Sequence, residues 1–186
     1  MNIEKFTDRS RGFLESAQSL AARENNQFLA PAHLLKVLLD DKKGVAASLL
    51  QKTGADVAAI REQVAKDVEK LPKVNGSSVQ VSASQDFVKA LDLAEQIATK
   101  AGDSFVTVER LLQALLAAKS YGVDLQKLNQ AINDMRQGRV ANSATAEDTF
   151  EALKKFATDY TERALQGKLD PVIGRDEEIR HTIQVL

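Results

Sequence analysis

The sequence predicts an all-α fold made of a duplicated helical unit, with the two copies related by pseudo-twofold symmetry. Apolar residues recur at helical spacing along most of the chain. The pattern of residues 10–39 returns at residues 87–116, where Phe28 and Phe105 set an offset of 77 (105 − 28). Further along, the motif beginning at Gly54 returns at Gly122, at an offset of 68 (122 − 54). Two copies are too few for a solenoid, so we expect a closed globule with a seam between its halves.

The first copy is expected to span about residues 6–71 and to hold four helices. Thr7 is typical of the residue that caps a helix N-terminus, and Pro31 suits the first turn of the second helix. The third and fourth helices are expected over residues 45–52 and 56–71.

The second copy is expected to span about residues 84–137, after a linker over residues 73–83. The change of offset from 77 to 68 removes nine residues (77 − 68), which is most of one helix. Ser84 and Thr107 are predicted N-caps. Residues 79–81 could be extended, but three residues are too few to predict a sheet. The expected helices cover residues 85–101, 108–118 and 123–136.

The composition changes after Gly138, so we expect the first domain to cover residues 1–138. Residues 140–146 are small and polar, so we expect a flexible linker over residues 139–146. Two further helices are predicted, over residues 147–165 and from Asp176 onward, and the apolar stripe of the last one has no partner in the chain. Residues 147–186 are therefore expected to be the helical start of a larger, truncated domain.

Composition excludes several classes of partner. The 186 residues carry a net charge of −1, which gives no long-range attraction to nucleic acid or to an anionic membrane. There is no cysteine, and no apolar run approaches the roughly 20 residues that span a bilayer. The first residues lack the pattern of a signal peptide, so a cytoplasmic location is expected.

Candidate catalytic and metal-binding residues are few. His33 lies near a helix start and is more simply explained as a structural residue than as a ligand, and His181 is given no role. No Gly-x-Ser-x-Gly turn is present, as a serine hydrolase would need. Glu177 and Glu178 suit the first turn of a helix better than an acid/base pair. We expect no catalytic residue and no metal site.

Two segments resemble the Clp/heat-shock family of AAA+ chaperones. Residues 26–35, Asn-Gln-Phe-Leu-Ala-Pro-Ala-His-Leu-Leu, are similar to the family's amino-terminal domain. Residues 167–179, Gly-Lys-Leu-Asp-Pro-Val-Ile-Gly-Arg-Asp-Glu-Glu-Ile, are similar to the entry into its first nucleotide-binding domain. The linker at residues 71–76 resembles that of the disaggregases more than that of the relatives that feed a peptidase.

The resemblance implies a function for a longer parent protein. That protein would be an ATP- and Mg²⁺-dependent homohexameric ring that threads aggregated chains through its pore and cooperates with a second chaperone system. The amino-terminal domain would dock unfolded or aggregated polypeptides. Val172, Ile173 and Gly174 would belong to the parent's nucleotide site, with Val172 and Ile173 lining the adenine pocket.

The resemblance also implies a substrate groove in the seam. Its polar rim would contain Thr7, Asp103 and Glu109, whereas an N-cap, a turn residue and a solvated acid explain them equally well. Leu14 and Leu91 could form an apolar floor, although leucines on a stripe are more often core residues. Arg110 stands where many relatives have an apolar residue, and it would favour clients with negative charge.

Two other functions remain open at this stage. The chain could be a regulatory piece whose tail still holds adenine. It could also be the adaptor-binding amino-terminal domain of a peptidase-linked Clp ATPase. Pull-downs with aggregated protein and with cell extract would distinguish the docking and adaptor-binding functions.

We predict that this chain neither binds ATP tightly nor hydrolyses it. The Gly-x-x-x-x-Gly-Lys-Ser/Thr loop that cradles phosphates at a helix N-terminus does not occur in the sequence. Isothermal titration should detect no tight complex, and a low-micromolar affinity for ATP would contradict the prediction.

Overall fold

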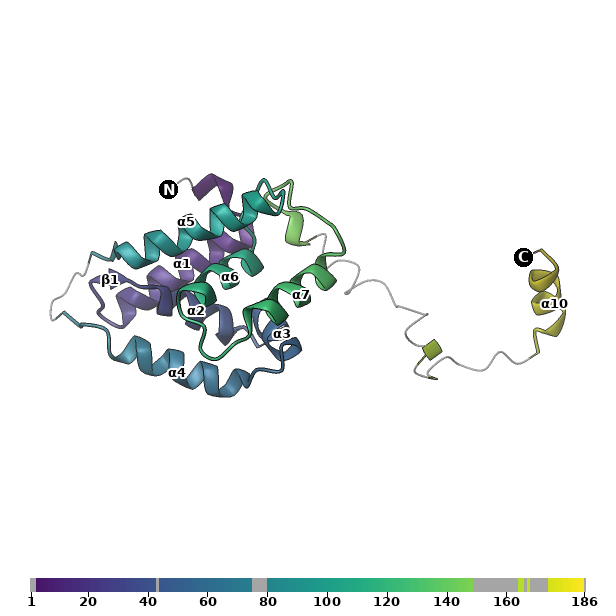
Figure 1. Cartoon of the computed structure of the whole chain (residues 1–186), viewed down its shortest axis with the longest axis horizontal. Coiled ribbons are helices and arrows are strands. Elements are labelled where there is room, and N and C mark those ends of the chain that lie inside the picture. The colour runs from purple at the N-terminus through teal and green to yellow at the C-terminus, as the bar shows by residue number, and fades with distance from the viewer. Residues whose placement is uncertain are drawn as a thin grey trace. The chain divides into compact units, whose positions relative to one another are not determined.

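Helices carry most of the chain in the computed structural model, which describes residues 3–42, 44–74, 80–148, 164, 165, 167 and 174–185 (Figure 1). The chain divides into two units, Met1–Phe150 and Glu151–Leu186. The first unit contains a 3₁₀ turn, η1, two short strands and seven α-helices among its described residues. These are η1 (Ile3–Lys5), α1 (Asp8–Arg23), β1 (Phe28–Leu29), α2 (Pro31–Asp40), α3 (Val45–Lys52), α4 (Val57–Glu69), β2 (Ser82–Ala83), α5 (Gln85–Lys100), α6 (Val108–Ala118) and α7 (Leu125–Arg136).

The duplication predicted from the sequence is confirmed by the helix boundaries. Helices α1 and α2 begin 77 residues before α5 and α6, and α4 begins 68 residues before α7. Helix α3 has no counterpart, because α6 ends at Ala118 and α7 already begins at Leu125. The nine residues missing from the second copy therefore correspond to α3.

Equivalent helices also begin with equivalent caps. Thr7 Oγ1 accepts the Ser10 amide at 3.2 Å, and Ser84 Oγ accepts the Phe87 amide at 3.1 Å. At the starts of α4 and α7, the carboxylates of Asp56 and Asp124 each accept two backbone amides. Capping removes unpaired donors at each helix end, which explains why these short polar residues recur at matching positions.

Short extended segments of the two copies pair with each other, a feature that the sequence analysis did not predict. Strands β1 and β2 pair in parallel, with Leu29 opposite Ala83. In the equivalent place Phe6 forms a parallel bridge with Val106. The Ser84 amide donates to Leu29 O at 3.0 Å, and the Thr7 amide donates to Val106 O at 3.1 Å. Each copy's first helix is therefore anchored on the other copy.

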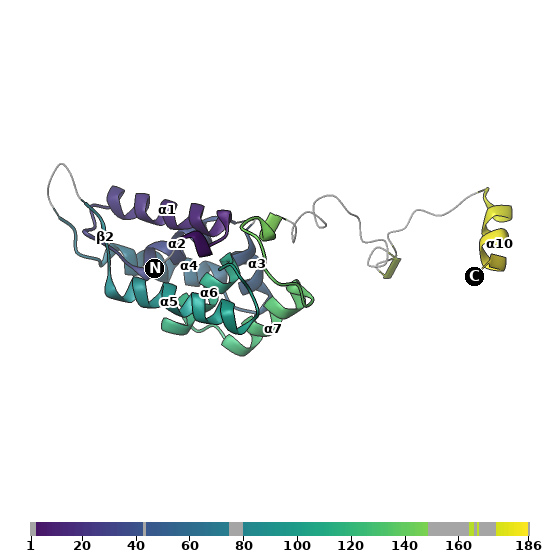
Figure 2. The same ribbon diagram turned by 90° about the horizontal axis from the view of Figure 1, so that it is seen from above.

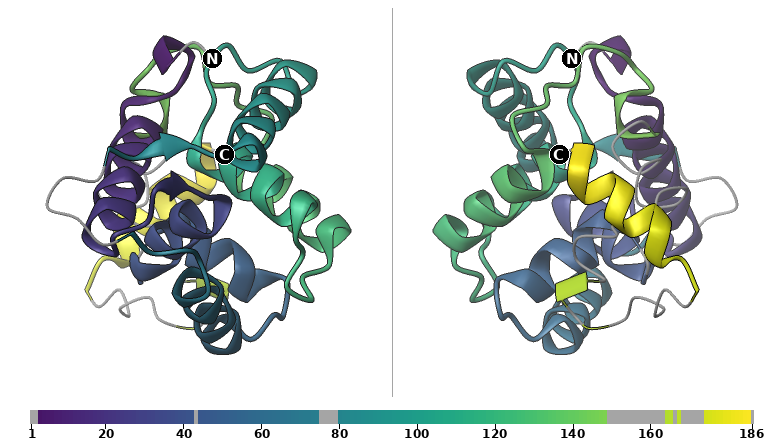
Figure 3. Two further views of the ribbon diagram at one scale, coloured as in Figure 1. Left: turned by 90° about the vertical axis from the view of Figure 1, so that its left-hand side faces the viewer. Right: turned by 90° about the vertical axis from the view of Figure 1, so that its right-hand side faces the viewer.

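The hydrophobic core lies between these halves. Helices α1 and α5 lie on opposite sides of the unit in two perpendicular views (Figures 2 and 3). Helix α2 contacts α4, α5 and α6, and α3 contacts α6 and α7. The largest fully buried side chains are Phe6, Leu34, Leu35, Leu38, Leu39, Leu49, Leu50, Leu91, Leu111, Leu112, Leu116 and Leu128.

The boundary predicted for the first domain differs from the structure. Residues 139–146 were expected to form a free linker, but Ala141 is fully buried and the Ser104 amide donates to its carbonyl at 2.9 Å. Glu147 is also buried, so the first unit extends past residue 138. Small side chains let this backbone lie close to the domain, which explains why a linker-like composition was misleading.

The remaining elements belong to the second unit. Residues 164 and 165 are helical, within the helix predicted over 147–165, and most of that range lies outside the described residues. Helix α10 (Asp176–Val185) begins where the acidic turn predicts. Among the described helices, none combines the length and apolar character needed to cross a membrane.

We predict that Phe6→Ala lowers the free energy of unfolding by about 3–5 kcal/mol, because it empties a fully buried site at the junction of the two copies. Ile3→Ala is the matched control, because Ile3 is 50% exposed and its truncation should change stability by less than about 0.5 kcal/mol. Urea unfolding followed by circular dichroism measures both values. Equal effects for the two variants would contradict the anchoring role of Phe6.

Candidate functional site

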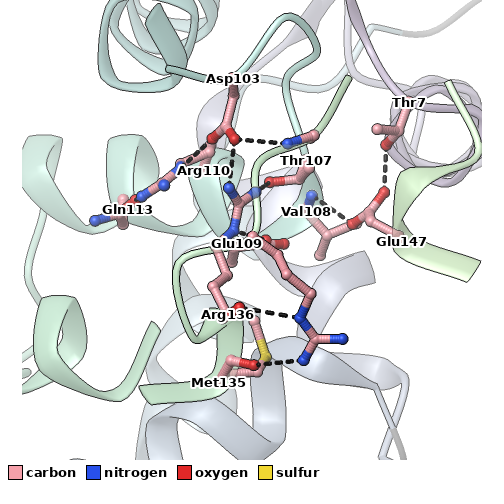
Figure 4. Close-up of polar contacts among 12 residues, drawn as sticks. Thr7, Asp103, Thr107, Val108, Glu109, Arg110, Gln113, Met135, Arg136 and Glu147 are labelled. Atoms are coloured by element: carbon pink, nitrogen blue, oxygen red, sulfur yellow. Dashed lines mark hydrogen bonds and ion pairs between the residues drawn. The ribbon is translucent and has the colours of Figure 1, made fainter. Parts of the chain in front are cut away.

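Four of the predicted site residues meet in one buried polar cluster. Thr7 comes from the start of α1, Asp103 from the turn before α6, and Glu109 and Arg110 from the first turn of α6 (Figure 4). None of the four is more than 7% exposed. The structure therefore brings these residues together, but it places them beneath the surface.

Arg136, at the end of α7, lies at the centre of this cluster. Its Nε donates to Glu109 Oε1 at 2.7 Å, and its other two nitrogens donate to Asp103 Oδ1 and to Thr107 Oγ1 at 2.9 Å. Burial opposes the charged form, but the carboxylates of Glu109 and Asp103 outweigh it and raise the pKa of Arg136. This guanidinium joins α6, α7 and the turn before α6.

Arg110 completes the pairing of Asp103. Its Nε lies 2.9 Å from Asp103 Oδ2, and its Nη1 donates to Gln113 Oε1 at 2.8 Å. Because Arg110 is only 6% exposed and its charge is compensated by Asp103, the expectation of an accessible cation at the groove edge is wrong.

Glu147 is the third carboxylate of the cluster. Its Oε1 accepts the Val108 amide at 2.8 Å, and its Oε2 accepts the Thr7 hydroxyl. Burial, followed by repulsion from Glu109, raises the pKa of Glu147 to about 7, although Thr7, Val108 and Arg9 act in the opposite direction. Three carboxylates thus face two guanidinium groups, and Glu147 is the one without a direct arginine partner among the described contacts.

The contact of Glu147 also corrects the predicted role of Thr107. Thr107 is the N-cap residue of α6, but its side chain accepts no amide of that helix. Its hydroxyl instead accepts from Arg136. The carboxylate of Glu147 binds the first amide of α6, where the helix dipole favours a negative charge.

Residues 139–148, which we call the strap, bind along the same cluster mainly through their backbone. The Ala141 amide donates to Asp103 Oδ1 at 2.8 Å, and the Ser104 and Phe105 amides donate to Ala141 O. Farther along, the Asp8 amide at the start of α1 donates to Ala144 O at 2.9 Å. The strap thus supplies acceptors to the N-termini of both α1 and α6.

The predicted apolar floor differs from the structure. Leu91 is fully buried and Leu14 is only 9% exposed, and both belong to the hydrophobic core. Their equivalent stripes in α1 and α5 face inward, so neither leucine lines an open groove in this structure.

The first copy holds a neutral version of the same arrangement. Asn26 and His33 correspond to Asp103 and Arg110 at the offset of 77, and Val68 corresponds to Arg136 at the offset of 68. His33 Nε2 lies 3.0 Å from Asn26 Oδ1, and the Asn26 amide group donates to Leu71 O and Pro72 O. The chain segments that follow α4 and α7 are therefore held at equivalent positions, by an amide in one copy and a carboxylate in the other.

His33 has the structural role that the sequence predicts. Its Nδ1 accepts the Ala30 amide at 3.0 Å, so Nε2 carries the proton that is donated to Asn26. Burial lowers the pKa of His33, which keeps the ring neutral. Among the described residues, no three acidic, histidine or cysteine side chains are grouped so as to hold a metal ion.

The residues predicted for a nucleotide site are not tested by the structure. Val172 and Ile173 lie outside the described residues, and Gly174 is exposed with a φ of 74°.

Comparison with known proteins identifies the family. Residues 5–125, about two thirds of the chain, match the model of the Clp repeat (R) N-terminal domain. The chain belongs to this Clp family. The matched range ends within the second copy, before Arg136 and the strap.

Named relatives agree with this assignment. The whole chain is 55% identical to part of the chaperone protein ClpB of Brucella suis and 43% identical to part of ClpB of Rickettsia felis. It spans 22% and 23% of the lengths of these two proteins, respectively. The fold is similar to that of the Hsp104 N-terminal domain of Candida albicans, with a TM-score of 0.67, 22% identity, and coverage of 77% of this chain and 99% of that one.

Sequence reasoning missed Arg136 and Thr107 as members of the cluster, and Glu147 as its third acid. Comparing the copies position by position would have revealed the first two, because Val68 and Ala30 are their counterparts. An arginine in place of a buried valine on an apolar stripe signals a buried acidic partner. The clue to Glu147 is Val108, which stands in the place of Pro31. Proline has no backbone amide, whereas the amide of valine needs a hydrogen-bond acceptor.

We predict that Arg136→Val lowers the free energy of unfolding by about 3–5 kcal/mol, because it leaves two buried carboxylates without their shared cation. Adding Asp103→Asn, Glu109→Ala and Arg110→His, which together restore the residues of the first copy, should recover at least half of the loss. Lys127→Val on the exposed face of α7 is the control and should change stability by less than about 0.5 kcal/mol. If the quadruple variant is less stable than Arg136→Val alone, the charge pairing is not the cause.

We also predict that the strap is held less firmly as the pH rises through 7. The pKa of Glu147 in the bound strap is about 7, above its ordinary value of 4.5, so the bound strap takes up a proton that a released strap does not hold. The resulting stabilisation is complete below about pH 4.5 and is lost as the pH rises through 7. The protection factor of the Val108 amide, measured by hydrogen exchange between pH 5.5 and 8, should fall accordingly.

Glu147→Gln is the control for this pH dependence. Glutamine keeps an oxygen that can accept the Val108 amide, but it does not titrate. Its protection factor should be flat over the same range, and a parent protein that is equally flat would contradict the prediction.

Proposed function

We propose that this chain is the substrate-docking domain of an ATP-dependent chaperone that disaggregates proteins and binds unfolded or aggregated polypeptides. The family match and the identity to ClpB proteins along the whole chain support this assignment. ATP with Mg²⁺, a homohexameric ring, a second chaperone system and a cytoplasmic location are proposed for a longer protein that contains this domain.

The observation that carries the proposal is the way in which the strap is bound. The strap already lies beside Thr7 and Asp103, and most of its polar contacts use its backbone. Backbone contacts hold a polypeptide without reading its sequence, as a domain that receives many unfolded chains requires. We therefore place client docking at the cluster formed by Thr7, Asp103, Glu109 and Arg110.

The proposed function predicts weak binding of an unfolded polypeptide at this cluster, with an affinity in the high-micromolar range, roughly −5 to −6 kcal/mol. Chemical-shift mapping with a reduced, carboxymethylated protein should show changes around the starts of α1 and α6. Changes confined to the exposed apolar residues Phe28, Val74 and Val88 would place the site away from the cluster.

Thr7→Ala should weaken client binding about threefold or more, and the chain offers a closely matched control. Ser84→Ala removes the equivalent cap from α5, at a similar cost of about 1 kcal/mol in stability, but away from the cluster. Equal client binding by the two variants would contradict the assigned site. Binding of a folded adaptor without any binding of unfolded protein would favour the adaptor function instead.

A further inference from the structure

We infer that the strap is a displaceable intramolecular occupant of the docking site, and that the position of Glu147 is where an acidic side chain of an incoming polypeptide binds. This inference rests on the proposed function, because it names what the docking site recognises and what covers it. The strap and an acidic segment of a client would compete for the same amides and the same hydroxyl.

The first argument is the position of the strap. Its contacts run from Asp103 at one end to Thr7 and Val108 at the other. It therefore lies on two members of the proposed site and on the first amide of α6. A client that reaches these groups has to move the strap.

The second argument is the nature of the contacts. Ala144 offers a backbone oxygen to the amide at the start of α1, and Glu147, three residues later, offers a carboxylate to the amide at the start of α6. The strap turns at Ser143–Thr145 and is helical from Ala146, so a client segment presents both acceptors when it forms the same turn with an acidic residue three positions after the carbonyl. The chemistry recognised is thus a main-chain carbonyl followed by a carboxyl group.

The third argument is that the strap is weakly anchored. Its two buried apolar side chains are alanines, Ala141 and Ala146, whereas Val140 is 40% exposed. Alanine buries little apolar area, so few hydrophobic contacts oppose release. The Glu147 carboxyl is buried beside Glu109, and its negative form is disfavoured there.

The first copy shows that this site is not a general property of the repeat. Its α2 begins with Pro31, which has no amide to offer, in the place of Val108. Ala32 stands in the place of Glu109. A carboxyl group therefore finds its donors at the start of α6 and not at the start of α2.

The test uses the full 186-residue chain with Glu147→Ala, which removes the two carboxyl oxygens that accept from Val108 and Thr7. Asp148→Ala is the matched control, because it removes a neighbouring exposed carboxylate. The Val108 amide should lose at least tenfold in protection in Glu147→Ala and remain unchanged in Asp148→Ala. Affinity for the carboxymethylated unfolded protein should rise about three- to tenfold in Glu147→Ala alone.

A synthetic peptide of residues 139–148 provides the second measurement. Added to the Glu147→Ala chain, it should shift the signals of Val108, Thr7 and Asp103, and the same peptide with alanine in place of its glutamate should bind at least fivefold more weakly. If the Val108 amide opens but the unfolded protein binds as it does to the parent, or if the two peptides bind equally, the inference is wrong. If the glutamate peptide binds but the unfolded protein binds neither the parent nor the variant, the proposed function fails instead.

Discussion

The second half of the domain depends on the ion pairs of one buried arginine. Arg136 is 3% exposed, and it links Asp103 to Glu109 across the turn between α5 and α6 and the end of α7. A buried charge is tolerated only when its partners and hydrogen bonds are complete. The same carboxylate of Asp103 also binds Arg110 and the amide of Ala141, so helix packing and attachment of the strap rely on one set of charges.

The two copies use the same backbone framework for different purposes. In the first copy the equivalent positions are neutral: His33 hydrogen-bonds to Asn26, and the buried Val68 stands in the place of Arg136. In the second copy the equivalent positions are charged, and a free helix amide at Val108 is available to a carboxylate. The pseudo-symmetric fold therefore contains one polar cluster that is purely structural and an equivalent one that can exchange its ligand.

Much of the fold could be predicted from the sequence, because helix caps and apolar stripes act over three or four residues. Thr7 and Ser84 mark helix starts that the structure confirms. The buried cluster could not be predicted in this way, since its members lie far apart along the chain and their charges suggested an exposed rim. The strap was misjudged for a related reason, because burial of alanine and backbone leaves little trace in composition.

The pairing of extended segments between the two copies has a consequence for synthesis on the ribosome. Phe6 is made before its partner Val106, which follows only after the rest of the first copy and α5. Until then the first helix lacks its backbone pairing partner, so the nascent domain cannot complete its fold. A chain cut between Val74 and Gln80 would yield two fragments, and each would carry the extended segments that pair with those of the other. Such fragments should reassemble when mixed.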